Sequence, residues 1–152
     1  MENSFVILPF QPENQEEVKE LILNGLVEHW GRLDPSKNPD LNDIASSYAQ
    51  GTFLVAWKEN QIVGTGALIW RSGEIGEIVR MSVAKEFRRS GIGRLILQRL
   101  IEEAQAKGFK KIILETTNTW DEVIQFYLRC GFQITHYQDE DVYFKMELNE
   151  PG

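Results

Sequence analysis

The chain has little of what several common protein classes depend on. Its single cysteine, Cys130, excludes an intrachain disulfide and a cysteine-rich zinc site. Sixteen Lys and Arg against 23 Asp and Glu give a net charge of −7, whereas a general nucleic-acid binder needs a basic surplus. No apolar run approaches the roughly 18 residues of a membrane span, and residues 1–5 show no basic leader. We expect a cytoplasmic protein that binds neither nucleic acid nor membrane.

The sequence has enough apolar side chains for one core. Its 152 residues fall within the roughly 100 to 200 that are typical of one domain. Hydrophobic residues make up 42% of the chain and aromatic residues 11%. A chain of this size can bury about two thirds of its unfolded surface. We expect residues 1–152 to form a single domain that is stable without disulfides or metals.

The apolar pattern predicts a mixed α/β order without repeats. β-branched and aromatic runs predict strands at 5–8, 52–57, 62–70, 74–83, 110–116, 132–137 and 142–148. Apolar residues at helical spacing predict helices within 18–30, 40–50, 92–107 and 119–130, with a loop at 31–39. Thr119 and Glu122 have the spacing of a capping box at the start of the last helix.

The segment Arg88–Arg94 (RRSGIGR) lies between a predicted strand and a predicted helix start. Free N–H groups and the positive end of the helix dipole favour an anion at such a place. Gly91 and Gly93 remove side chains that would block a close approach, and three arginines add positive charge. Taken alone, the pattern is more often an ordinary turn with solvated arginines. The segment is not a Walker loop, because Arg94 follows Gly93 where that loop has a lysine. It is not a dinucleotide fingerprint either, because Ile96 stands where the third glycine would be.

Three motifs together resemble a known family. Arg88, Gly91 and Gly93 meet the pattern [Gln/Arg]-x-x-Gly-x-[Gly/Ala], and Glu77–Val83 is similar to a central strand that precedes it. Phe126–Phe132 (FYLRCGF) meets a later Phe/Tyr-Tyr-x-x-x-Gly-Phe element. Signature, strand and later element are those of the GNAT superfamily of N-acetyltransferases, which the chain resembles in both order and spacing.

The resemblance implies a fold and a cofactor. The fold would be a mixed, mostly antiparallel central sheet with flanking helices and two splayed parallel central strands. Acetyl-CoA would bind where these strands splay, its pantetheine arm pairing with strand backbone as an added strand. The positions that match are Met81, Ser82, Val83, Arg88, Arg89, Ser90, Gly91, Ile92, Gly93, Arg94, Asn118 and Tyr127. Asn118 stands nine residues before the tyrosine, where the family usually has seven.

Glu77 is the candidate general base for transfer to an amine. A lysine-type amine has a pKa near 10.4 and must lose a proton before it can attack a thioester. Strand alternation predicts that Glu77 shares a row with the apolar residues Ile75, Val79, Met81 and Val83. Such surroundings would raise the pKa of its carboxyl group, which suits a base.

Two other arrangements of Glu77 stay open. The carboxylate pairs with an arginine such as Arg71 or Arg80, or a bulge turns it outward. In either arrangement the role of Glu77 would be structural.

Tyr127 is the candidate general acid for the departing thiolate, because it follows Val123 by one turn on the predicted helix. An isolated tyrosine is more often a core residue with a satisfied hydroxyl. His29 and His136 have no metal-ligand spacing, and we expect no metal. The acidic turn 139–141 either attracts a cationic substrate or is simply solvated.

The expected function is therefore direct transfer of an acetyl group from acetyl-CoA to a primary amine of a small molecule or peptide. A non-catalytic acyl-CoA-binding sensor or scaffold is the alternative, and a nucleotide-phosphate-binding domain outside the superfamily ranks last. The resemblance implies that residues 23–44 wall the acceptor side. The sequence leaves open the acceptor, the acyl chain, and whether the chain forms a homodimer.

Overall fold

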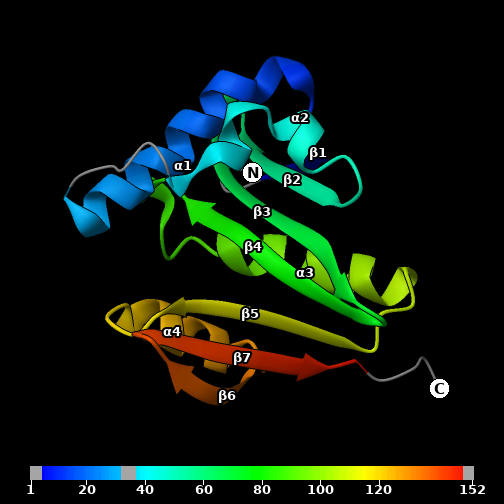
Figure 1. The fold of residues 1–152 in the computed structure, drawn as a ribbon. Helices are drawn as coiled ribbons and strands as arrows, with labels where there is room; N and C mark the ends of the chain where they lie inside the picture. Colours follow the sequence, from blue (N-terminus) through cyan, green and yellow to red (C-terminus); the bar gives the residue numbers. More distant parts are fainter. Residues whose placement is uncertain (1–4, 32–36, 149–152) are drawn as a thin grey trace.

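The computed structural model describes residues 5–31 and 37–148, which build one seven-stranded sheet with helices on both faces (Figure 1). The strands are β1 (Val6–Pro9), β2 (Thr52–Lys58), β3 (Gln61–Ser72), β4 (Ile75–Val83), β5 (Lys111–Thr117), β6 (Gln133–Gln138) and β7 (Asp141–Glu147). The α-helices are α1 (Gln15–Trp30), α2 (Ile44–Ser47), α3 (Ile92–Ala106) and α4 (Asp121–Arg129). Short 3₁₀ turns lie at Pro12–Asn14 (η1), Pro39–Asn42 (η3) and Lys85–Phe87 (η4).

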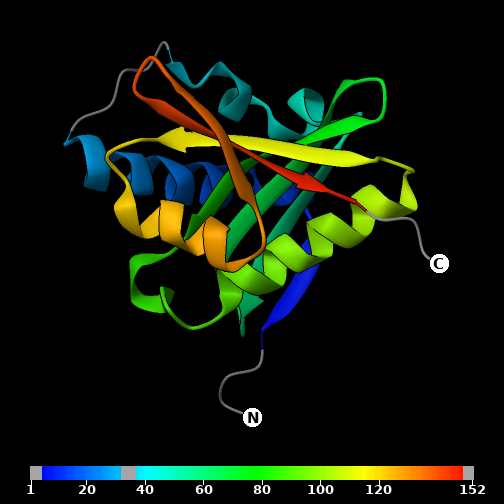
Figure 2. The same ribbon diagram turned by 90° about the horizontal axis from the view of Figure 1, so that it is seen from below.

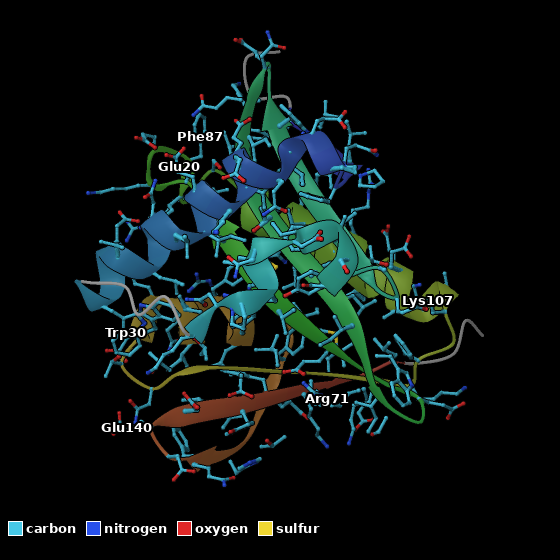
Figure 3. All side chains as sticks on the ribbon, turned by 45° about the horizontal axis from the view of Figure 1, so that its top comes forward. Glu20, Trp30, Arg71, Phe87, Lys107 and Glu140 are labelled. Atoms are coloured by element: carbon cyan, nitrogen blue, oxygen red, sulfur yellow. The ribbon has the colours of Figure 1, made fainter. Side chains whose placement is uncertain are left out.

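The helices lie in two layers, α1 and α2 on one face and α3 and α4 on the other (Figures 1 and 2). Helix α3 packs on the sheet because its apolar residues recur at helical spacing; those buried are Ile92, Ile96, Leu97, Leu100 and Ala104. In the described part of the chain, α1 and α2 lie over β2 to β4, and no helix of that face covers β5, β7 and β6 (Figures 1 and 3). We call this uncovered side the open face.

The strand order β1-β2-β3-β4-β5-β7-β6 is antiparallel except for the pair β4 and β5. These two strands pair only from Ile75 opposite Lys111 to Glu77 opposite Ile113. Beyond Glu77 they diverge, as Figure 1 shows at the arrow end of β4. The expected fold class, with its splayed parallel central pair, is confirmed.

A bulge interrupts β4 just after the divergence. Val79 pairs with Ala67 and Ser82 with Thr65, so two residues of β4 face the single residue Gly66 of β3. The first of the two, Arg80, has a φ of +57°. A left-handed residue that is not glycine costs on the order of 1 kcal/mol or more, so its surroundings must hold it. The hydroxyl of Thr65 does part of this by donating to the Arg80 carbonyl at 2.8 Å.

The expected row of apolar residues around Glu77 is wrong in part, because the bulge interrupts it. Val79 packs with the core under α1 and α2, whereas Met81 and Val83 pack with the core under α3. The extra residue reverses the alternation, because side chains change face at every residue of a regular strand. Met81 and Val83 therefore lie on the face opposite Glu77.

Other expectations differ from the structure in detail. The capping box at Thr119 is wrong: α4 begins at Asp121 with Trp120 at the N-cap. The expected loop at 31–39 lies partly outside the described residues, and Pro39–Asn42 forms a 3₁₀ turn. Across residues 5–31 and 37–148, no helix has the length and apolarity needed to cross a membrane.

Candidate functional site

The turn before α3 presents unpaired backbone amides. Gly91 stands at the N-cap with a φ of +93°, and no side chain caps the helix. Among the described residues, the amides from Gly91 to Arg94 have no acceptor, as expected at a helix start. A Cβ added to Gly91 would meet nothing within 4 Å. The turn is therefore an open, positively polarised end of a helix, which suits an anionic group.

Two of the three arginines of this turn, Arg88 and Arg89, already have partners. Arg88 donates to Glu28 at 2.6 Å and to the carbonyl of Val83 at 3.2 Å. Arg89 pairs with Glu122 at 2.8 Å, with both side chains more than four fifths exposed. Such exposed pairs contribute little and can exchange partners. The amides are the fixed part of the turn, and the arginines are an adjustable addition.

Glu77 is buried on the α1 and α2 face of β4. Its exposed fraction is 5%, and it pairs with Arg71 at the end of β3, labelled in Figure 3. Arg71 itself remains half exposed. The pairing with Arg71 was one of the arrangements left open by the sequence. The guanidinium both fixes the carboxylate and occupies one of its oxygens.

Tyr127 lies on the other face, on the buried side of α4. Its ring packs against Phe126, Phe132 and Phe144, with centroid distances of 5.2 to 5.8 Å. No described residue hydrogen-bonds its hydroxyl. Burial, and secondarily the neighbouring Cys130, raises the pKa of the Tyr127 hydroxyl. The group thus remains a proton donor across the neutral range.

The second half of β4 joins the turn and α4. A Cβ on Gly93 would lie 3.5 Å from the ring of Phe126 and 3.7 Å from the Val83 side chain. Met81 and Val83 border the same core, while Ser82 faces Gly25 of α1. On its β5 side this half of the strand is unpaired within the described chain. The structure thus brings the turn, the free strand edge and α4 together.

Asn118 follows the free part of β5. It is exposed in the turn after β5, and its amide donates to the Glu140 carbonyl at 2.8 Å. The Trp120 ring next to it lies 6.5 Å from that of Trp30, so the end of α1 reaches the β5–α4 connection (Figure 3). The hydrogen bond to Glu140 ties Asn118 to the β6–β7 turn.

The acidic turn 139–141 borders the open face. Glu115 stands opposite Tyr143 in the β5–β7 pairing, and Tyr143 stacks on His136 at 4.4 Å. Burial, followed by the charge of Asp141, raises the pKa of the Glu115 carboxyl. Carboxylates and an aromatic platform thus line the face onto which Glu77 also points.

A polar cluster centred on Arg80 was not predicted from the sequence. Its Nε donates to Asp40 Oδ2 at 3.0 Å and its Nη2 to Asp40 Oδ1 at 2.7 Å. Nη2 also reaches Asn38 Oδ1 at 3.1 Å, and the Tyr48 hydroxyl donates to Asp40 Oδ2 at 2.6 Å. We call these four residues the Arg80 cluster. Its members are up to 42 residues apart, so no local motif could reveal it.

Charge and burial shift the ionisation of this cluster. Burial works against the charge of Asp40, but hydrogen bonds from Arg80 and Tyr48 outweigh it and lower the pKa of Asp40. Burial and the bond to Asp40 raise the pKa of Tyr48 to about 12. At neutral pH the cluster is therefore an ion pair with a neutral tyrosine.

Comparisons with known proteins agree with this geometry. Residues 16–132 match the family model described as the acetyltransferase (GNAT) family. An IAA acetyltransferase from Azospirillum brasilense is 35% identical over 120 residues, 78% of this chain and 78% of that protein. The chain spans about half the length of the first curated relatives it matches, 50% of one from Xenopus tropicalis and 47% of one from Rattus norvegicus.

Solved structures share the fold. An acetyltransferase of the GNAT family from Staphylococcus aureus Mu50 superposes with a TM-score of 0.88 at 23% identity, covering 96% of this chain and 100% of that one. The PaiA N-acetyltransferase from Thermoplasma acidophilum, in complex with coenzyme A, gives 0.79 at 21% identity, with 95% and 99% covered. At these identities the likeness concerns the fold.

Proposed function

The chain belongs to the acetyltransferase (GNAT) family, and from that premise we propose that it transfers the acetyl group of acetyl-CoA directly to a primary amine of a small molecule or peptide. The observation that carries the proposal is the divergence of β4 and β5 after Glu77. Among residues 5–31 and 37–148 it leaves a strand edge unpaired between two faces, one with the Glu77 carboxylate and one with the Tyr127 hydroxyl.

The described residues fit a CoA thioester. The open turn at Gly91 and its unpaired amides would hold the diphosphate, and the backbone of Met81 to Val83 would pair with the pantetheine arm. The neighbour from Thermoplasma acidophilum, bound to coenzyme A, supports this assignment. When bound, acetyl-CoA supplies an activated acyl group.

Glu77 and Tyr127 would divide the proton chemistry. Glu77 would accept a proton from the attacking amine, directly or through water, while Arg71 keeps the carboxylate oriented. Tyr127 would donate a proton to the departing thiolate, since its raised pKa keeps the hydroxyl protonated at neutral pH. The two groups face opposite sides of the sheet, so each would act on one of the two reacting partners.

A panel of amines tests the proposal. The chain is incubated with acetyl-CoA and, separately, lysine, a tripeptide with a free N-terminus, an aminoglycoside or an aromatic amine, and free thiol is measured. We expect release with at least one amine, together with the acetylated product by mass spectrometry. Absence of release from every amine, with intact acetyl-CoA binding in calorimetry, would contradict catalysis.

The contact between Arg71 and Glu77 favours one second candidate, a non-catalytic acyl-CoA-binding module. An ion-paired carboxylate is a less available base. The same assay separates the two, because a sensor binds acetyl-CoA without releasing thiol.

A further inference from the structure

The Arg80 cluster lies on the α1 and α2 face of β4, the face onto which Glu77 also points. Arg80 is the bulged residue of β4, three positions after Glu77 and directly before Met81 to Val83. Asp40 and Asn38 lie in and beside η3, and Tyr48 follows α2. The side-chain exposure of Arg80 and Asp40 is 19% and 28%, so the pair is shielded more than an ordinary surface contact.

Residues 38–48 are held by the burial of Leu41 and Ile44 in the core and by two separate sets of polar contacts. On one side Gln15 of α1 binds the Leu41 carbonyl at 2.7 Å and the Ile44 amide at 2.9 Å, and Lys19 binds Asn42 at 2.9 Å. On the other side, Arg80 binds both oxygens of Asp40. Helix α1 anchors the segment to its own layer, whereas Arg80 anchors it to the strand that carries Glu77.

The bulge makes this second anchor possible. In a regular strand, Arg80 would alternate with Val79 and point to the α3 face. The positive φ keeps it on the α1 and α2 face, where Asp40 receives it. Arginine suits the task because its planar fork holds both carboxylate oxygens, which a lysine cannot do.

We propose that Arg80 is a positioning residue, which fixes the segment 38–48 against β4 and so sets the wall of the acceptor site relative to Glu77. This rests on the proposed transfer to an amine. Arg80 touches neither acceptor nor acetyl-CoA in this scheme; it acts through Asp40. Because Arg80 takes no part in the proton transfers of this scheme, we expect loss of its anchor to act on acceptor binding, which raises KM with little change in kcat.

The test compares Arg80→Met with Lys19→Met. Both remove one long cation that holds residues 38–48, but Lys19→Met cuts a tie to α1 and leaves the tie to β4. Steady-state kinetics use the panel amine that the unmodified chain acetylates fastest. We expect Arg80→Met to raise the KM for the amine about tenfold and to change kcat less than about threefold. Lys19→Met should leave both within about twofold.

Two further measurements complete the experiment. In calorimetry, the acetyl-CoA affinity of Arg80→Met should stay within about twofold of that of the unmodified chain. The KM of Arg80→Lys for the amine should lie between the values of the unmodified chain and Arg80→Met. Hydrogen exchange should quicken at the amides of residues 38–48 in Arg80→Met and stay slow in β2 and β3. Unchanged exchange at 38–48, an unchanged KM, or an equal loss of acetyl-CoA affinity overturns the proposal. If the unmodified chain acetylates no amine, the proposed function fails, and the exchange measurement still decides whether Arg80 holds the segment.

Discussion

The two halves of β4 have the same neighbour on one side and different surroundings on the other. From Ile75 to Glu77 the strand is paired with both β3 and β5, and Glu77 is buried and ion-paired. From Arg80 to Val83 it keeps β3, loses β5 and reverses its alternation through the bulge. One strand thus offers a rigidly held carboxylate in its first half and a free backbone edge in its second. The predictions below test each half against the other.

Loss of the Glu77 carboxylate is the largest expected effect. Glu77→Gln keeps the size of the side chain but removes the proton acceptor, so turnover should fall about a hundredfold or more at saturating amine. Acetyl-CoA affinity should not change, because the proposal has Glu77 act on the amine and not on acetyl-CoA. Glu74→Gln, an exposed neighbour, is the matched control for kinetics and calorimetry. A loss below about threefold would give Glu77 a structural role.

The bulge should tolerate no side chain at Gly66. A Cβ there would lie 2.6 Å from Ile96 Cγ2 and 2.7 Å from Met81 Sδ. Gly66→Ala should lower the free energy of unfolding by about 1 to 3 kcal/mol in urea denaturation. Gly25→Ala in α1 meets only Ser82 Oγ at 3.5 Å and should instead raise it by about 0.5 to 1 kcal/mol. Equal stability of the two variants would show that the bulge is not tightly packed.

The turn after the second half of β4 is tested with the two glycines that flank α3. Gly91 and Gly108 both have positive φ, and an added Cβ meets nothing within 4 Å at either one. Valine at either position should cost similar stability through backbone strain. Only Gly91→Val should weaken CoA binding, by about tenfold or more in calorimetry, because only this end carries the free amides. Equal affinities in the two variants would remove the diphosphate from this turn.

The Tyr127 hydroxyl should matter for turnover and not for stability. Because no described residue bonds it, Tyr127→Phe should not lower the free energy of unfolding. Turnover should fall about tenfold near pH 6 to 7 and recover as the pH approaches the thiol pKa of about 8.5, where the thiolate leaves unaided. Tyr137→Phe, on the exposed surface of β6, is the control. Normal turnover of Tyr127→Phe at pH 6 would leave Tyr127 as a packing residue.

Acid should weaken the ion pair between Arg80, in the second half of β4, and Asp40. The pKa of Asp40 in the folded chain lies below its ordinary 3.8. Ionised Asp40 therefore contributes to the free energy of unfolding above pH 3.8, and this contribution is lost as the pH falls through the lowered pKa. The stability difference between the unmodified chain and Asp40→Asn should therefore be constant near neutrality and shrink below about pH 4. Chemical denaturation at a series of pH values measures it. A difference that persists in acid would mean that the charge of Asp40 does not hold the cluster.

The sequence could predict the parts that depend on neighbours along the chain. The order of strands and helices followed from apolar spacing, and the start of α3 from two glycines after a strand. The contact between Glu77 and Arg71 could be anticipated because the two residues are six positions apart and joined by a turn. The capping box at Thr119 failed, because a spacing of residue types alone does not fix where a helix starts.

The residues themselves determined the fold class, the family and the turn that favours an anion, since these reside in local patterns of apolar residues and glycines. The tertiary structure alone decided which face each residue of β4 occupies. A single extra residue at Arg80 moves Met81 and Val83 to the face opposite Glu77, and no alternation pattern reveals it. It also decided that Asp40, Tyr48 and Arg80 meet, because the path of the chain between them, not their spacing, brings the three together.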